Sequence, residues 1–241
     1  MAACMSAAIA LTGCTVNRSG RPIVHDVSAA ISPANWFGVI GANGSGKTTL
    51  LRAMAGRLPI SAGSCAIFGE EQAHDRSARA RAIGFAPPIE HLPALLKVRE
   101  LLSLAGDPVA VQQERNAALW QALGITALLD LRADECSSGM RQRVALALAF
   151  AVPSRIVILD EPFNWLDPVA AYDVRAALAE MVKQGLTLIT ALHDLTTLCG
   201  FCDGGIVLAK GRVSLQLDEP RLRTGRNDAA RFERELVAAL R

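Results

Sequence analysis

The stretch Gly41-Ala42-Asn43-Gly44-Ser45-Gly46-Lys47-Thr48-Thr49 decides the fold. A short apolar run, 36–40, precedes it, and a helical pattern follows from Thr48 to about Ala55. Strand, glycine loop and helix in this order form a cradle for an anion, because the loop wraps a phosphate and the helix N-terminus points at it. Lys47 is placed to reach the β- and γ-phosphates of a nucleotide, and the Thr48 hydroxyl is placed to ligate Mg²⁺. The pattern therefore predicts a nucleotide site over residues 41–49.

The composition is that of a folded globular protein. The chain has 241 residues, of which 51% are hydrophobic and 20% are charged. These values allow a large core and argue against disorder, a coiled coil and a small disulfide-dependent scaffold. Lys and Arg nearly balance Asp and Glu, and a net charge of +2 does not mark a nucleic-acid binder. The longest apolar run, 144–152, is about half of the roughly 20 residues that cross a bilayer, so we expect no membrane span.

Two local patterns admit an alternative interpretation that we do not favour. Leu11-Thr12-Gly13-Cys14 resembles a bacterial lipidation site, but no Lys or Arg precedes it, and the segment also has the pattern of a half-buried strand. Cys199 and Cys202 have C-x-x-C spacing, but a zinc site needs a second pair or histidines at ligand spacing. We expect a strand around Ile9 and reduced, mostly buried cysteines in a cytosolic protein.

A second element with polar chemistry lies downstream of the glycine loop. The continuous apolar run 156–159 indicates a buried parallel strand, and it ends in Asp160-Glu161-Pro162. Ligands bind outside the carboxyl ends of the strands in open α/β sheets. We therefore predict that Asp160 approaches Mg²⁺ and that Glu161 activates the attacking water. By itself the segment better fits a strand that ends in a solvated acidic turn, and it is the glycine loop upstream that favours the catalytic interpretation.

The segment Cys136-Ser137-Ser138-Gly139-Met140-Arg141-Gln142-Arg143 lies between these two elements. A helical pattern begins at Ser137 and runs to about Ala151, so a hydroxyl, backbone N–H groups and a positive dipole end suit an anion. The segment resembles the signature motif of ATP-binding cassette (ABC) ATPases, usually Leu-Ser-Gly-Gly-Gln. The alternative is a plain Ser N-cap on an apolar helix. The resemblance implies that four residues contact the ATP of a partner subunit: Ser137, Ser138, Gly139 and Met140.

Two further segments resemble motifs of the same family. Asn164-Trp165-Leu166-Asp167 is similar to the D-loop, with Asp167 as its acidic residue. His193 follows a predicted strand over 186–192 and resembles the switch histidine. The resemblance implies a neutral imidazole that hydrogen-bonds the γ-phosphate and holds the water and Glu161 in place. A solvated turn histidine is the alternative, which the order of the motifs disfavours.

The chain departs from the family pattern in the loop that would contact the base of the nucleotide. An aromatic residue commonly stacks on adenine from a loop near Gly20, and Arg18 occupies the aligned position. The Arg18 guanidinium either stacks on the base or is an exposed turn arginine. In both cases the sequence predicts loose base selectivity.

The chain also departs from the family pattern in segments that would lie near the γ-phosphate. The segment 83–88 resembles the Q-loop, but Pro88 stands where a glutamine usually contacts Mg²⁺ and water. Either Glu90 or His91 replaces that contact, or the loop simply covers the site. In the signature, Ser138 replaces a glycine and Met140 a glutamine, which would slow closure of a dimer without abolishing it.

The resemblance implies an α/β fold: a P-loop NTPase core of the ABC type with an N-terminal antiparallel β subdomain and an inserted α-helical subdomain. We assign residues 1–217 to this ABC ATPase domain. Apolar residues at helical spacing place the helical subdomain at about 89–152. The C-terminal tail, 218–241, carries an amphipathic helical pattern from Asp228 to Arg241, which docks on its own domain or contacts a second copy.

The resemblance implies an ATPase with ATP and Mg²⁺ that powers transport through a separate integral membrane subunit, as a homodimer or as a heterodimer with a second ABC ATPase. Such a subunit works in the cytoplasm, peripherally on the cytoplasmic face of the inner membrane, and no nucleic-acid partner is expected. The signature and the missing Q-loop glutamine favour export over import. The alternative is an ABC ATPase that acts on ribosomes or DNA, but such proteins usually have tandem cassettes or a coiled-coil insertion. A cassette that only binds ATP is disfavoured because Glu161 and His193 are both present.

Overall fold

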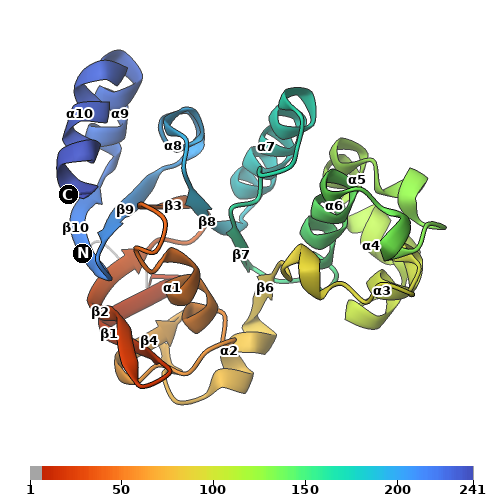
Figure 1. The fold of residues 1–241 in the computed structure, drawn as a ribbon, viewed down its shortest axis with the longest axis horizontal. Helices are drawn as coiled ribbons and strands as arrows, with labels where there is room; N and C mark the ends of the chain where they lie inside the picture. The colour runs from red at the N-terminus through yellow and green to blue at the C-terminus, as the bar shows by residue number, and fades with distance from the viewer. Residues whose placement is uncertain (1–6, 241) are drawn as a thin grey trace, which may run out of the picture.

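The computed structural model describes residues 7–240, which form two β sheets with helices around them (Figure 1). The larger sheet has six strands in the order β10-β9-β3-β8-β7-β6. All neighbouring pairs in it are parallel except β9 with β10. Its strands are β3 (Trp36–Ile40), β6 (Ile83–Phe85), β7 (Ile156–Asp160), β8 (Thr187–Leu192), β9 (Gly204–Ala209) and β10 (Arg212–Leu217).

The central strands of this sheet are buried on both faces. Every residue of β8 is buried, and so are the first four of β7. Such continuous apolar strands are typical of parallel sheets with both faces covered. Because β3, β8 and β7 are adjacent and parallel, their carboxyl ends lie at one edge of the sheet. At that edge lie the glycine loop, the Asp160-Glu161 pair and His193.

The smaller sheet is antiparallel and has the order β2-β1-β4-β5. Its strands are β1 (Ile9–Arg18), β2 (Arg21–Ile31), β4 (Ala62–Ile67) and β5 (Glu70–Glu71). Its apolar face packs on α1 (Lys47–Met54), the helix that follows the glycine loop. This arrangement confirms the predicted N-terminal antiparallel subdomain. Cys14 is fully buried within β1, which confirms the strand interpretation of that segment.

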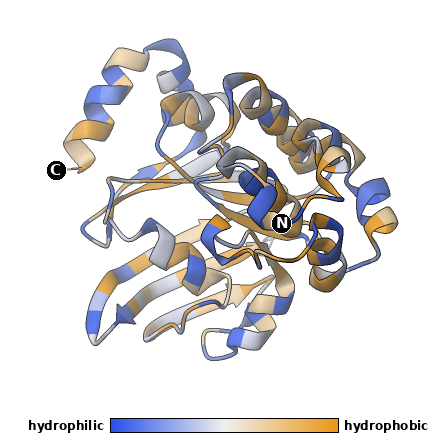
Figure 2. Ribbon diagram, turned by 45° about the vertical axis from the view of Figure 1, so that its right-hand side comes forward, coloured by the Kyte–Doolittle hydropathy of each residue, from blue (hydrophilic) through white to orange (hydrophobic). Residues whose placement is uncertain are grey.

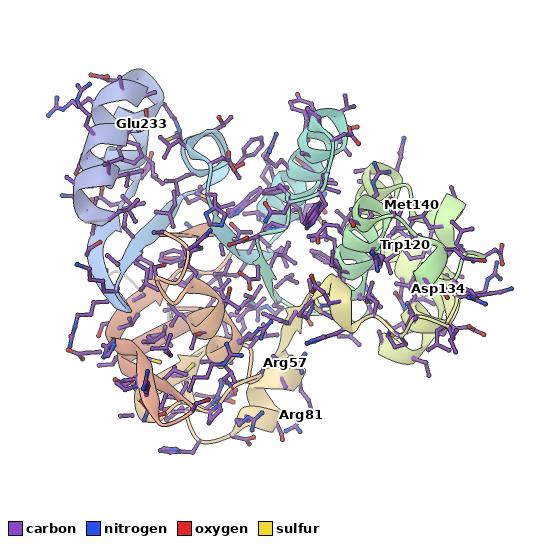
Figure 3. The ribbon with its side chains drawn as sticks, viewed as in Figure 1. Arg57, Arg81, Trp120, Asp134, Met140 and Glu233 are labelled. Carbon is purple, nitrogen blue, oxygen red and sulfur yellow. The ribbon has the colours of Figure 1, made fainter. Side chains whose placement is uncertain are left out.

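The part of the chain that connects β6 to β7 forms a group of helices at one side of the larger sheet (Figure 1). Their apolar faces form a cluster that includes Leu102, Trp120 and Val144. Figure 3 labels Trp120 and Met140 in this group. The α-helices of this segment are α3 (Val98–Ala105), α4 (Val109–Arg115), α5 (Ala117–Leu123) and α6 (Ser138–Leu148), with short 3₁₀ helices at Ile89–His91, Ile125–Leu128 and Ala133–Glu135. Outside this group, α2 (Arg76–Ala82) precedes β6, and α7 (Pro168–Lys183) connects β7 to β8.

The tail contains two helices, α9 (Glu219–Asn227) and α10 (Ala229–Leu240), where the hydropathy pattern predicted one. Asp218 caps α9 by accepting a hydrogen bond from the backbone N–H of Arg221. In α10 the apolar residues alternate with charged ones (Figure 2), and Phe232 and Leu236 are buried. The tail docks on α8 (Leu195–Phe201), where Arg226 donates to the carbonyl oxygen of Cys199.

The cysteines of the described chain are buried in its core. The five at positions 14, 65, 136, 199 and 202 are free and buried. Burial raises the pKa of Cys14 to about 12, so its thiol stays protonated at neutral pH. Cys4 lies outside the described residues. No helix between residues 7 and 240 combines the length and the apolar character that crossing a membrane needs.

Candidate functional site

The glycine loop between β3 and α1 has a backbone that only glycine adopts easily. Gly44 and Gly46 have φ values of +77° and +104°. A Cβ on Gly41 would lie 2.4 Å from the Oγ of Ser45 and 2.5 Å from the carbonyl oxygen of Leu208. The loop lines a cavity together with Arg18, Ile23 and Glu161. The structure therefore brings residues 43–49 and Arg18 to one hollow, whereas Gly41 and Ala42, which the sequence also predicts to bind nucleotide, do not line it.

Lys47 lies inside this loop and is only 4% exposed. Its Nζ donates to the carbonyl oxygen of Gly41 at 2.8 Å and to that of Ala42 at 3.4 Å. The same Nζ lies 3.8 Å from Oε1 of Glu161. Burial lowers the pKa of Lys47, while the carboxylates of Glu161 and Asp160 act in the opposite direction. A buried ammonium at the mouth of an amide-lined loop is suited to a phosphate.

Thr48 and Asp160 form the neighbouring part of the site. Burial raises the pKa of Asp160, and a hydrogen bond with the Thr48 side chain opposes this effect. Oδ1 of Asp160 is buried and has no hydrogen-bond partner among the residues that the structure describes. A hydroxyl beside an unsatisfied carboxylate oxygen is the hard oxygen set that Mg²⁺ prefers. The residues present therefore fit a magnesium ion at this place.

Glu161 and His193 are far apart in the sequence but in direct contact in the fold. They follow β7 and β8, which are paired in parallel with Asp160 opposite Ala191. His193 Nε2 hydrogen-bonds Oε1 of Glu161, and the ring nitrogen donates to the carboxylate in the tautomer that carries its proton on Nε2. The other carboxylate oxygen, Oε2, accepts a 2.9 Å hydrogen bond from Nδ2 of Asn164. The sequence motifs assign no separate role to Asn164. Its position three residues after Glu161, beyond Pro162, is the feature of the sequence that could have indicated this contact.

The four signature residues lie at the start of α6 and do not line the glycine-loop cavity of their own chain. Figure 3 shows Met140 well apart from the place of α1 in Figure 1. Ser137 is the N-cap, and its Oγ accepts from the backbone N–H of Met140 at 3.2 Å. A Cβ on Gly139 would lie 2.8 Å from the carbonyl oxygen of Trp165, so the segment after Glu161 packs closely on this motif.

Two polar contacts tie α6 to the segment after β7. Nε2 of Gln142 is buried and donates to the carbonyl oxygen of Pro162 at 3.0 Å. Arg143 pairs with Asp167 at 3.1 Å, and Asp167 also caps α7. These contacts therefore connect α6 to the turn that carries Glu161.

The Q-loop segment covers the Thr48 and Asp160 side of the site. Pro87, Pro88 and Glu90 line the same cavity as these two residues. Of the two residues considered as replacements for the missing glutamine, Glu90 lines that cavity and His91 does not.

A family model described as ABC transporter matches residues 24–164 of the chain. The chain belongs to the ABC transporter family. It is an ATP-binding subunit of that family, and it hydrolyses ATP in a reaction coupled to transport. It is 33% identical to the hemin import ATP-binding protein HmuV of Bordetella pertussis over 217 residues, which cover 83% of this chain and 82% of the relative.

Solved structures show the same fold as this ABC ATPase. One, described as the ATP-binding subunit of an ABC transporter, has a TM-score of 0.82 with 24% identity and covers 95% of this chain and 99% of its own. A dimeric structure of MJ0796, a bacterial ABC transporter cassette, has a TM-score of 0.76 with 21% identity and covers 88% of this chain and 98% of its own. The predicted ABC ATPase fold, with its antiparallel subdomain and mixed sheet, is thereby confirmed.

Proposed function

We propose that this ABC ATPase hydrolyses ATP with Mg²⁺ between two cassettes arranged head to tail and thereby powers transport through a separate membrane subunit. The observation that carries the proposal is the convergence of Lys47, Asp160 and Glu161 at the glycine loop. Lys47 and the amides of residues 44–46 bind the β- and γ-phosphates. Thr48 and Asp160 hold Mg²⁺, which supplies neutralisation of the phosphate charge when bound.

Glu161 acts as the general base in this proposal. Its carboxylate takes a proton from the attacking water, and His193 holds the carboxylate and the γ-phosphate in register. Ser137, Ser138, Gly139 and Met140 close the site of the partner cassette. That role is consistent with their separation from the glycine loop of their own chain. Asp167 links the signature helix to the turn after Glu161.

The membrane partner places the subunit on the cytoplasmic face of the cell membrane. The sequence expectation of export stays a prediction: the signature and Pro88 favour it, whereas the relative named above is an import protein. The test is purification of the tagged chain from detergent-solubilised membranes. We expect an integral membrane protein to co-purify, identified by mass spectrometry. Ribosomal or DNA-bound partners in its place would favour the alternative function.

Base selectivity gives a first prediction. Arg18 ends β1 and lines the glycine-loop cavity, and among residues 7–240 no aromatic side chain lines that cavity. We expect hydrolysis rates for ATP and GTP to differ by far less than roughly 100-fold, about 2.7 kcal/mol. Arg18→Ala should raise KM for both nucleotides alike if the guanidinium stacks on the base. Arg21→Ala is the matched control, since Arg21 faces Arg18 in the β1–β2 hairpin but does not line the cavity. A preference for ATP above a hundredfold would contradict the prediction.

Dimer closure gives a second prediction. Trp36 and Trp120 are buried, whereas Trp165, beside the signature motif, is 67% exposed. In a head-to-tail dimer the signature end of one cassette is covered by the other, so the exposed fraction of the Trp165 side chain decreases. We expect an ATP-dependent blue shift of tryptophan emission in the hydrolysis-deficient Glu161→Gln protein. Trp165→Phe in that background should remove the shift, and a shift that persists would disprove the assignment.

A further inference from the structure

The side chain of Asn164 contacts Glu161 directly. Its Nδ2 donates a 2.9 Å hydrogen bond to Oε2 of the carboxylate. The other oxygen, Oε1, contacts His193 and lies 3.8 Å from Nζ of Lys47. The two oxygens are therefore held separately: one faces the glycine loop and the end of β8, and the other is held by Asn164.

The turn that connects these two residues is tightly determined. Glu161 has a φ of +51°, a left-handed conformation that a residue with a Cβ adopts only when its surroundings require it. Pro162 follows with a fixed φ, and its carbonyl oxygen accepts from the buried Gln142 side chain. The backbone N–H of Asn164 then donates to the carbonyl oxygen of Glu161 at 3.3 Å. This closed turn returns the Asn164 amide to the carboxylate three residues earlier.

Asn164 also lies where the two cavities beside Glu161 meet. It lines the one that contains Thr48 and Asp160 and the one that contains His193. Its amide holds Oε2, whereas Oε1 is the oxygen that lies toward Lys47 and His193.

We propose that Asn164 is a positioning residue for ATP hydrolysis, whose amide holds one oxygen of Glu161 so that the other meets the attacking water. The inference rests on the proposed role of Glu161 as the base. A fixed orientation of the carboxylate removes unproductive rotamers. This effect acts on the chemical step and leaves the phosphate contacts unchanged.

The test compares variants of Asn164 that differ in whether the side chain can donate a hydrogen bond to Glu161. Asn164→Leu removes the donor, and Asn164→Asp replaces it by a negative charge. We expect kcat to fall by roughly 10- to 100-fold in Asn164→Leu, with KM for ATP nearly unchanged. Asn164→Asp, which also lacks the N–H donor, should lower kcat to a similar extent. Asn164→Gln, which keeps an amide, should retain more activity than Asn164→Leu. Asn227→Leu at the end of α9 is the matched control.

A double-mutant cycle separates this inference from the function on which it rests. In the Glu161→Gln background, Asn164→Leu should change the residual rate by less than about twofold, because the carboxylate base that Asn164 orients is then absent. Equal losses in both backgrounds, or a wild-type rate in both Asn164→Leu and Asn164→Asp, would overturn the positioning role. A Glu161→Gln protein that hydrolyses ATP normally would instead overturn the proposed function.

Discussion

Glu161→Gln is expected to lower the rate of ATP hydrolysis by about 10² to 10⁴-fold while leaving ATP binding intact, since general-base removal has this typical cost. Glutamine keeps the size of the side chain and one acceptor oxygen in place of the two that contact His193 and Asn164, but it accepts no proton at neutral pH. The measurement is phosphate release at saturating ATP, with binding of labelled ATP alongside. A variant that hydrolyses at the wild-type rate would remove Glu161 from this role.

The same variant tests the dimer. If intact ATP bridges Lys47 of one cassette and Ser137 of the other, loss of hydrolysis should make an ATP-bound dimer accumulate that wild type forms only transiently. Size-exclusion chromatography with light scattering, with and without ATP, measures this. Adding Ser137→Arg should prevent the dimer, because a bulky side chain then stands at the N-cap where phosphate docks. A Glu161→Gln protein that stays monomeric in saturating ATP would favour a heterodimer with a second ABC ATPase.

Lys47→Ala should abolish ATP binding at ordinary nucleotide concentrations. The change removes the buried ammonium, which the loop carbonyls of Gly41 and Ala42 hold in place. Charge-assisted hydrogen bonds to phosphate are among the strongest in proteins, and a loss of about 3 kcal/mol lowers affinity by more than about 100-fold. Equilibrium binding of labelled ATP is the readout.

Lys183→Ala is the matched control for Lys47→Ala. Lys183 is exposed at the end of α7, and its ion pair is with Glu180 on the same helix. Thermal unfolding of both variants separates a binding defect from a folding defect. Unchanged ATP affinity in Lys47→Ala would disprove the phosphate-cradle assignment.

Residues 41–49 and Asp160-Glu161 could be recognised in the sequence because each motif is short and contiguous. A glycine loop works through the backbone of neighbouring residues, so its chemistry is complete within one stretch of chain. The same holds for the N-cap at Ser137 and for the buried apolar run of β7. The paired strands of the N-terminal subdomain could also be anticipated, since resemblance to the ABC ATPases implies them. The helix α9 was missed, because its stability comes from the Asp218 cap and from Leu222 packing on the domain.

The sequence by itself therefore determined the fold family, the nucleotide loop and the acidic pair, all of which depend on contiguous residues. Only the tertiary structure decided which side chains meet at Glu161. The parallel pairing of β7 with β8 brings His193 to one carboxylate oxygen, and the closed turn at Pro162 brings Asn164 to the other. It also decided that Glu90 rather than His91 lines the Thr48 and Asp160 cavity. These relations depend on strand order and on backbone direction at single residues, which no local pattern of residue types specifies.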